Sequence, residues 1–294
     1  MLIDQQSEIA ALLALSARVG RNPLLVQASS GNTSIKLSGV LWIKASGKWL
    51  ARAAEEDLLV PISLAAVRES VQRDEEVSAA GASIETAMHA VLRHKVVVHV
   101  HSVNTISWAV RQDGAARVAE RLAGLNWSWI PYAGSGLPLA REIRAVTTRS
   151  PQTNIFVLAN HGLVVCGESC HAVEDLLDIV EERLAVNPRK DIDPVAARIL
   201  SSGILCPCQM MLTAPRYEEM TDCQRAIWIG LLQVARRLDE SAPIRYLSNA
   251  EINDLLENDI HGYLDRAERN AIPAAVPVRE VAPLAVRAAV HAGT

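Results

Sequence analysis

A run of valine and histidine in the middle of the chain constrains the fold more than any other feature. Residues 95–101 are Lys-Val-Val-Val-His-Val-His, and such a series of β-branched side chains favours a strand that is buried on both faces. Apolar residues at helical spacing over 83–94 predict a helix that leads directly into this strand. A buried strand flanked by helices indicates a layered α/β domain.

The remaining pattern extends this domain over residues 1–190. Ser38-Gly39 separates two short β-type runs and predicts a hairpin, so the sheet is not purely parallel. Beyond Pro188 we expect a helical extension over 191–271 packed on the same domain, and an extended or disordered tail over 272–294. The other expected helices lie at about 4–18, 103–112, 114–123, 171–185, 191–200, 218–238 and 249–269, and the other strands at 33–37, 40–44, 154–158 and 163–166.

Composition excludes several classes of protein. Half of the 294 residues are apolar, which a disordered chain would not have. The net charge of −4 argues against a nucleic-acid or anionic-membrane partner, which would require a basic surface. No run of about 18 apolar residues occurs, and acidic Asp4 stands where a signal peptide carries basic residues. Five cysteines do not suggest a disulfide framework. We therefore expect a soluble, cytoplasmic protein.

His99 and His101 are the sharpest functional signal. On a strand, side chains at i and i+2 lie on one face about 7 Å apart, so two imidazoles can converge on one metal ion. His161 follows another predicted strand, where a break would turn its ring towards a cleft and Gly162 would tolerate unusual backbone angles. Three histidines with an open fourth position would form a catalytic metal site. A bare His-x-His pair can also be ordinary polar packing.

Glu85 is predicted on the helix that precedes the histidine strand. Beside a divalent ion its carboxylate could be a fourth ligand or a general base, whereas a helix glutamate taken alone is usually a solvated surface group. His89 lies one turn further along on the same face, and we interpret it as a structural, hydrogen-bonding histidine rather than a ligand.

Two other motifs are weak. Gly134-Ser135-Gly136 suggests a dinucleotide loop but has no glycine at the third position of that motif. Cys206-Pro207-Cys208 could bind a metal, yet no second cysteine pair has suitable spacing. We interpret these thiols as buried or incidental.

Five motifs in a fixed order resemble the class II aldolase/adducin family, which includes fuculose- and rhamnulose-phosphate aldolases. The resemblance covers roughly residues 5–185 and is closest to the aldolase-like half of bacterial proteins fused to a short-chain dehydrogenase. The motifs are Gly31-Asn32-Thr33-Ser34, Ala45-Ser46-Gly47, Ser83-Ile84-Glu85 with His89, His99-Val100-His101-Ser102 and Asn160-His161-Gly162.

The resemblance implies a three-layer α/β/α fold with a central, largely antiparallel mixed sheet, usually in a homotetramer. It also implies Zn²⁺, or another divalent metal such as Mn²⁺ or Co²⁺, on His99, His101 and His161, with Glu85 as the acid/base residue. The family positions that hold the substrate phosphate are matched by Gly31, Asn32, Ser46, Gly47 and Ser83. A glycine-containing loop can bring backbone N–H groups to phosphate oxygens, and positive charge could come from Lys36, Lys44 or Lys48.

The resemblance predicts a divalent-metal-dependent lyase of the aldolase type, which acts on a small sugar phosphate or related hydroxy-carbonyl compound through a metal-stabilised enediolate. Two positions depart from the aldolases: residues 112–127 lack their tyrosine, and Ile84 stands where they can carry a second phosphate-binding serine. Epimerisation, dehydration or decarboxylation on the same metal site therefore remain alternatives. A further alternative is a non-catalytic, adducin-like interaction module, which would be expected to lack the histidines present here.

Overall fold

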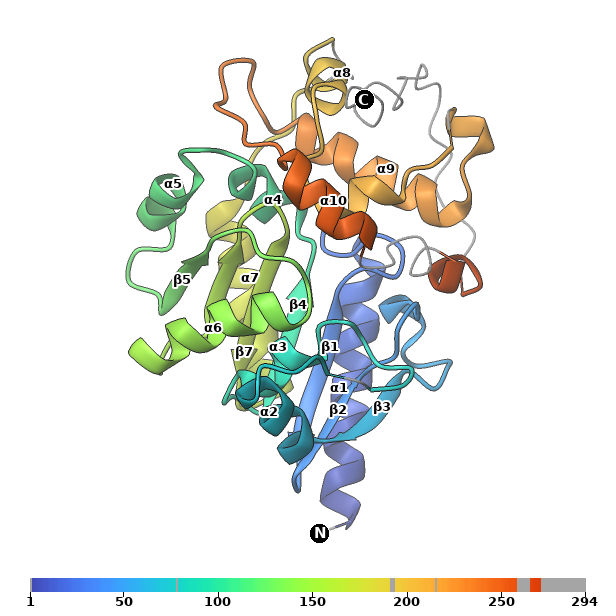
Figure 1. The fold of residues 1–294 in the computed structure, drawn as a ribbon, viewed down its shortest axis with the longest axis vertical. Helices are drawn as coiled ribbons and strands as arrows, with labels where there is room; N and C mark the ends of the chain where they lie inside the picture. Colours follow the sequence, from blue (N-terminus) through green and yellow to red (C-terminus); the bar gives the residue numbers. More distant parts are fainter. Residues whose placement is uncertain (1, 78, 191–193, 215, 258–264, 271–294) are drawn as a thin grey trace.

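A seven-stranded sheet forms the centre of the computed structural model, which describes residues 2–77, 79–190, 194–214, 216–257 and 265–270 (Figure 1). The strand order is β3-β2-β1-β4-β7-β6-β5. Only the β5–β6 pair is parallel among these neighbours, so the predicted mixed, largely antiparallel sheet is confirmed. The strands are β1 (Asn32–Leu37), β2 (Val40–Lys44), β3 (Leu59–Ser63), β4 (Val96–Val100), β5 (Trp127–Ile130), β6 (Ile155–Leu158) and β7 (Gly162–Gly167).

Helices cover both faces of this sheet, as expected for three layers. One apolar cluster joins the sheet to α1 and α7, and another joins its opposite face to α3 and α6. The helices within residues 2–190 are α1 (Leu2–Arg21), α2 (Leu64–Gln72), α3 (Thr86–Val91), α4 (Val103–Ala109), α5 (Gly114–Arg121), α6 (Leu137–Arg149) and α7 (Cys170–Leu184), with a short 3-10 helix η1 (Leu50–Arg52).

Side-chain alternation along β4 separates the two layers. Val96, Val98 and Val100 pack in the cluster with α1 and α7, whereas Val97 packs in the cluster with α3 and α6. His99 follows the same alternation and shares the face of Val97, on the side of the sheet where α3 begins. The predicted strand at residues 95–101 is therefore confirmed in position and burial.

The predicted hairpin is also present. Leu37 pairs with Val40 across the turn, and both turn residues have positive φ, 50° at Ser38 and 80° at Gly39. Such a two-residue turn matches the twist of the flanking strands. The pattern did not predict β3, α2, β5 or α6; β3 is an edge strand that contains Pro61, and proline is tolerated at an edge.

The region after α7 is helical and packs against the α/β domain. Figure 1 shows its helices gathered at one end of the sheet, and a shared apolar cluster joins those at Pro194–Ser201 and Asp222–Ala235 to α4. The predicted helix at 218–238 begins later, at Asp222, because the Thr221 hydroxyl accepts a hydrogen bond from Gln224 N and caps it. The elements are α8 (Pro194–Ser201), η2 (Pro207–Met211), η3 (Tyr217–Glu219), α9 (Asp222–Ala235) and α10 (Asn249–Glu257).

Parts of the predicted extension lie outside the described residues. These are 191–193, 215, 258–264 and 271, and the predicted tail at 272–294 also lies outside the described residues. Within the described residues, the single helix expected over 249–269 is seen as α10 and a helical turn at 265–268. The domain boundaries remain a prediction. No described helix has both the length and the apolar character that a membrane crossing requires.

Candidate metal centre

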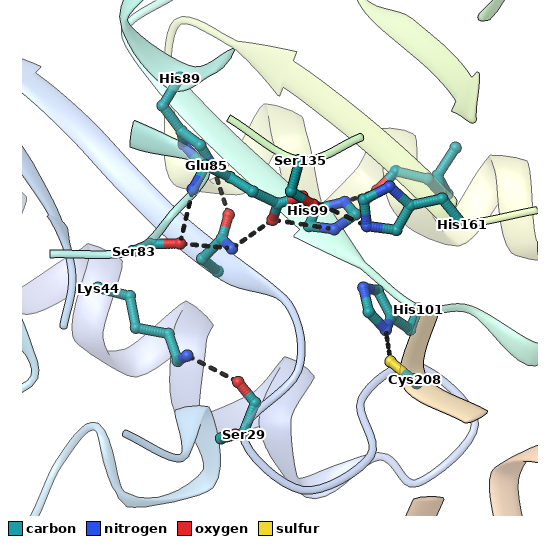
Figure 2. Close-up of polar contacts among 12 residues, drawn as sticks. Ser29, Lys44, Ser83, Glu85, His89, His99, His101, Ser135, His161 and Cys208 are labelled. Carbon is teal, nitrogen blue, oxygen red and sulfur yellow. Dashed lines mark hydrogen bonds and ion pairs between the residues drawn. The ribbon is translucent and has the colours of Figure 1, made fainter. Parts of the chain in front are cut away.

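Three histidines from two segments of the sheet converge in the structure. Their ring centroids lie 4.9 to 5.2 Å apart, and one nitrogen from each ring can be chosen so that all three lie within 4.8 Å of one another (Figure 2). All three side chains are buried. Burial lowers the pKa of His101 and lowers that of His161 to about 4, although Glu85 opposes the shift. Neutral imidazoles are the form that binds metal ions. The residues are His99, His101 and His161.

The turn between β6 and β7 places His161 beside the other two rings. A Cβ added to Gly162 would lie 2.4 Å from the Val100 carbonyl oxygen, so this glycine permits the close approach of β7 to β4. The residue with the unusual backbone is Asn160, at φ 52°, and Gly162 is not among those with positive φ. The prediction that Gly162 supplies unusual angles is therefore wrong, because the constraint on it is space rather than conformation.

His99 has a defined proton position. Its Nδ1 lies 3.0 Å from the Leu163 carbonyl oxygen, which can only accept, so Nδ1 carries the hydrogen. In the neutral ring Nε2 then holds a lone pair, and it has no hydrogen-bond partner among the described residues. It lies 3.3 Å from Glu85 Oε2, another acceptor. Two buried acceptors at this distance repel each other unless a cation or proton lies between them, so the donor set fits a divalent ion.

Glu85 is held from several sides just before α3. Its Oε2 accepts a 2.7 Å hydrogen bond from Asn32 Nδ2, and its Oε1 accepts one of 3.3 Å from Ser135. Its Oε1 also lies 3.3 Å from His161 Nε2. Burial acts to raise the pKa of this carboxyl, but the neighbouring imidazoles of His99 and His161 and the hydrogen bond from Asn32 act to lower it and outweigh burial, so the pKa is lowered. Glu85 was predicted within a helix, and it is instead the residue that precedes one, which frees its side chain to face the histidines.

A buried chain of hydrogen bonds supports Asn32. His89 Nε2 donates to Asn32 Oδ1, and the Ser34 hydroxyl donates to His89 Nδ1 at 2.7 Å. Burial, together with the charge of Lys36, lowers the pKa of His89, so its ring is neutral and has one donor and one acceptor. The prediction that His89 is a structural, hydrogen-bonding residue is confirmed.

A cavity of about 130 Å³ opens onto His101, His161 and Glu85. Of the five residues that the resemblance assigns to phosphate, four line it: Gly31, Asn32, Ser46 and Ser83. The fifth, Gly47, is adjacent to Ser46, at φ +74°, and a Cβ there would lie 2.8 Å from the Arg266 main chain. The structure thus brings two of the three candidate ligands, the candidate acid/base residue and most of the candidate phosphate residues to one cavity.

Two basic side chains line the same cavity. Lys44 is 2% exposed, donates to the Ser29 carbonyl at 2.8 Å, and has its pKa lowered to about 7 by burial, against the opposing charge of Glu85. Arg266 donates to the Ser46 hydroxyl at 3.3 Å. The two other lysines considered from the sequence have different partners: Lys36 donates to the His94 carbonyl and Lys48 to Glu56.

The cavity is also lined by residues that sequence reasoning did not assign to the site, among them Ser135, Cys208 and Arg266. Ser135 and Cys208 lie in the two motifs that the sequence analysis interprets as weak. Each motif was judged only against a known local pattern, so contacts with residues far away in the sequence were not considered. Cys208 Sγ lies 3.0 Å from His101 Nδ1. Nothing in the local sequence predicts that Arg266 reaches the cavity, since its hydrogen bond to Ser46 spans 220 positions.

Comparison with known proteins gives relatives that include an uncharacterized oxidoreductase and a dehydratase. The chain is 26% identical over 196 residues to the uncharacterized oxidoreductase YuxG of Bacillus subtilis. The matched region covers 58% of this chain and 28% of that protein. It is 31% identical over 173 residues to methylthioribulose-1-phosphate dehydratase of Microcystis aeruginosa. Here the matched region covers 52% of this chain and 82% of that enzyme. The chain thus spans less than a third of the first relative's length and most of the second's.

The fold has a counterpart among solved structures. The N-terminal class II aldolase domain of a conserved protein from Thermoplasma acidophilum matches with a TM-score of 0.53 and 24% identity, over 60% of this chain and 92% of that one. This likeness bears on the fold alone and agrees with the predicted architecture. Residues 10–187, more than half of the chain, match the family described as Class II Aldolase and Adducin N-terminal domain, and the chain therefore belongs to that family.

Proposed function

We propose that this protein is a divalent-metal-dependent lyase that acts on a small sugar phosphate or a related hydroxy-carbonyl compound. The observation that carries the proposal is the buried His99 Nε2 lone pair that faces the Glu85 carboxylate at 3.3 Å. A cation shared by the three histidines would relieve this repulsion. When bound, a divalent ion such as Zn²⁺, Mn²⁺ or Co²⁺ supplies Lewis-acid stabilisation of negative charge on substrate oxygens.

Glu85 is the residue placed to move the proton. Its two oxygens are held by Asn32 and Ser135, so the carboxylate can take up or release a proton without leaving the cavity. In aldol cleavage a base takes a hydroxyl proton, the carbon–carbon bond breaks to release an aldehyde, and the electron pair left beside the carbonyl is protonated. The burial of Glu85, which is 4% exposed, limits competing exchange with water.

The cavity is also lined by groups that are suited to bind an anionic group. Arg266 supplies positive charge, Lys44 supplies a buried amine, and Ser46 and Ser83 supply hydroxyl groups. Charged donors bind phosphate oxygens more strongly than neutral ones. The volume of about 130 Å³ limits the substrate to a small compound.

Dehydration is the second candidate reaction. It is favoured by the dehydratase relative, of which the chain covers 82%. In that reaction a base takes the proton from the carbon beside the carbonyl, and the hydroxyl group on the next carbon leaves as water. Tyr132, downstream of the segment without tyrosine, does not line the cavity of this chain. It packs with Ile204 and Leu255, and its hydroxyl has no hydrogen-bond partner in the described part of the chain.

The test combines metal analysis with turnover of a panel of ketose 1-phosphates. Aldol cleavage releases dihydroxyacetone phosphate, detected by a coupled reduction, whereas dehydration keeps the carbon skeleton and loses one water, detected by mass spectrometry. We expect His99→Ala to lose bound metal and turnover together. His171→Ala, at a side chain that is 85% exposed, is the matched control and should retain both.

Retention of metal and turnover by His99→Ala would contradict the proposal. Absence of both from the unmodified protein would favour a non-catalytic, adducin-like role. The homotetramer expected from the resemblance remains a prediction, and mass measurement in solution tests it.

A further inference from the structure

We propose that Cys208 is a positioning residue of the metal centre, whose sulfur accepts a hydrogen bond from His101 Nδ1–H and so keeps His101 Nε2 directed at the ion. The sulfur lies 3.0 Å from Nδ1, within hydrogen-bond distance. Both side chains line the cavity. The inference rests on the metal dependence proposed above, and it concerns a residue outside the family match at 10–187.

His101 needs an acceptor that the sheet does not supply. His99 lies within β4, and the pairing of β4 with β7 brings the Leu163 carbonyl to its Nδ1. His101 lies one residue beyond the end of β4, where the strand ladder has ended. A metal-binding histidine generally donates its second ring N–H to an acceptor that fixes the tautomer and the ring orientation. The sulfur of Cys208 occupies that place.

The geometry distinguishes this role from direct ligation. The nitrogens that can share one ion belong to His99, His101 and His161. Figure 2 shows the Cys208 sulfur against one edge of the His101 ring, while the opposite edge faces the other two imidazoles. The two nitrogens of an imidazole direct their lone pairs or hydrogens away from each other. A sulfur that binds Nδ1 is therefore placed behind the ring, away from the ion.

The segment that carries Cys208 is fixed in place. Gln209, the next residue, binds the chain that precedes Cys208 at two points: Leu205 N donates to Gln209 Oε1 at 2.9 Å, and Gln209 Nε2 donates to the Gly203 carbonyl at 3.1 Å. The Asn160 amide donates to the Leu205 carbonyl at 2.8 Å, which ties the turn beside His161 to the same segment. The C-terminal region thus supports two of the three candidate ligands.

Binding of Co²⁺ or Zn²⁺ alone to the full chain tests the inference. We expect Cys208→Ala to bind either metal about 10- to 100-fold more weakly than the unmodified protein. Cys208→Ser keeps an acceptor oxygen and should recover part of that loss. Cys170→Ala is the matched control, because Cys170 is buried in the separate cluster with α1 and α7, and it should bind with unmodified affinity. The unfolding temperature in the presence of a chelator should be the same for Cys208→Ser and the unmodified protein.

Three outcomes would overturn the inference: unchanged affinity in Cys208→Ala, an equal loss in Cys170→Ala, or a sulfur-to-cobalt charge-transfer band that disappears in Cys208→Ser. The last would make the sulfur a direct ligand. Failure of the proposed function is distinguishable, because it would appear as unchanged metal affinity in His99→Ala, whatever the cysteine variants show.

Discussion

The Asn32 side-chain amide donates a 2.7 Å hydrogen bond to Glu85 Oε2 across 53 positions of the sequence. The pairing of β1 with β4 makes this possible, because it sets Asn32 directly opposite His99. The same amide receives a hydrogen bond from His89 at its oxygen, so its orientation is defined. Asn32 therefore links the acid/base candidate to the strand that carries two candidate metal ligands.

Replacement of Asn32 by Asp tests this link. The substitution removes the N–H donor and puts a second acceptor beside the Glu85 carboxylate, so we expect turnover to fall by about 10- to 100-fold, the usual effect of losing a hydrogen bond to a charged group. Metal content, measured by elemental analysis, should change little because the three histidines are retained. Full turnover in Asn32→Asp would show that Glu85 does not depend on the amide.

Arg266 is expected to bind the anionic group of the substrate. It donates to Ser46 at the cavity wall, so Arg266→Gln should weaken competitive inhibition by inorganic phosphate about tenfold or more while metal affinity is unchanged. The matched control is Arg269→Gln, since Arg269 is exposed on the same short segment. Equal inhibition constants for the two variants would contradict a role for Arg266 in anion binding.

Lys44 should make the stability of the fold depend on pH. Burial lowers its pKa from 10.5 to about 7, so between these values the unfolded chain binds a proton that the folded chain lacks. The contribution of this group to the free energy of unfolding therefore rises with pH, by up to about 1.4 kcal/mol per pH unit.

Comparison with Lys44→Met isolates this effect. The unfolding free energy of the unmodified protein minus that of the variant should increase from about pH 7 to about pH 9, as measured by denaturant titration. Lys36, with a similarly lowered pKa, is present in both proteins, so its contribution cancels in the difference between their unfolding free energies. Parallel pH curves for the two proteins would show that Lys44 is not buried as a neutral amine.

Gly162 should tolerate no side chain. A Cβ there would lie 2.4 Å from the Val100 carbonyl oxygen, so Gly162→Ala must push β7 away from β4 and displace His161. We expect a loss of about 1–3 kcal/mol in the free energy of unfolding, and weaker metal binding. Gly167→Ala, in the same strand, meets only a Val173 methyl group at 3.1 Å and should cost less. Equal losses of stability and metal affinity in both variants would contradict this account.

Local pattern was sufficient for the elements that bury a regular apolar face. The strand at β4, the hairpin of β1 and β2 and the long helices α1 and α7 follow from side-chain periodicity, and all were predicted near their observed positions. β3 and β5 were not, because both are edge strands, and their residues are only partly buried, so they carry less of the periodic signal. The start of α3 was misplaced because no side chain caps it.

The sequence alone determined which residues can supply imidazole and carboxylate groups, since His-x-His on a strand and a histidine at a strand break are local patterns. Tertiary structure decided how those groups are oriented and what surrounds them. Ser135, Cys208 and Arg266 reach the cavity through contacts spanning 50, 107 and 220 positions. Contacts of that kind depend on strand register and on packing between layers. The sequence around a side chain does not indicate which distant residue it will contact in the folded chain.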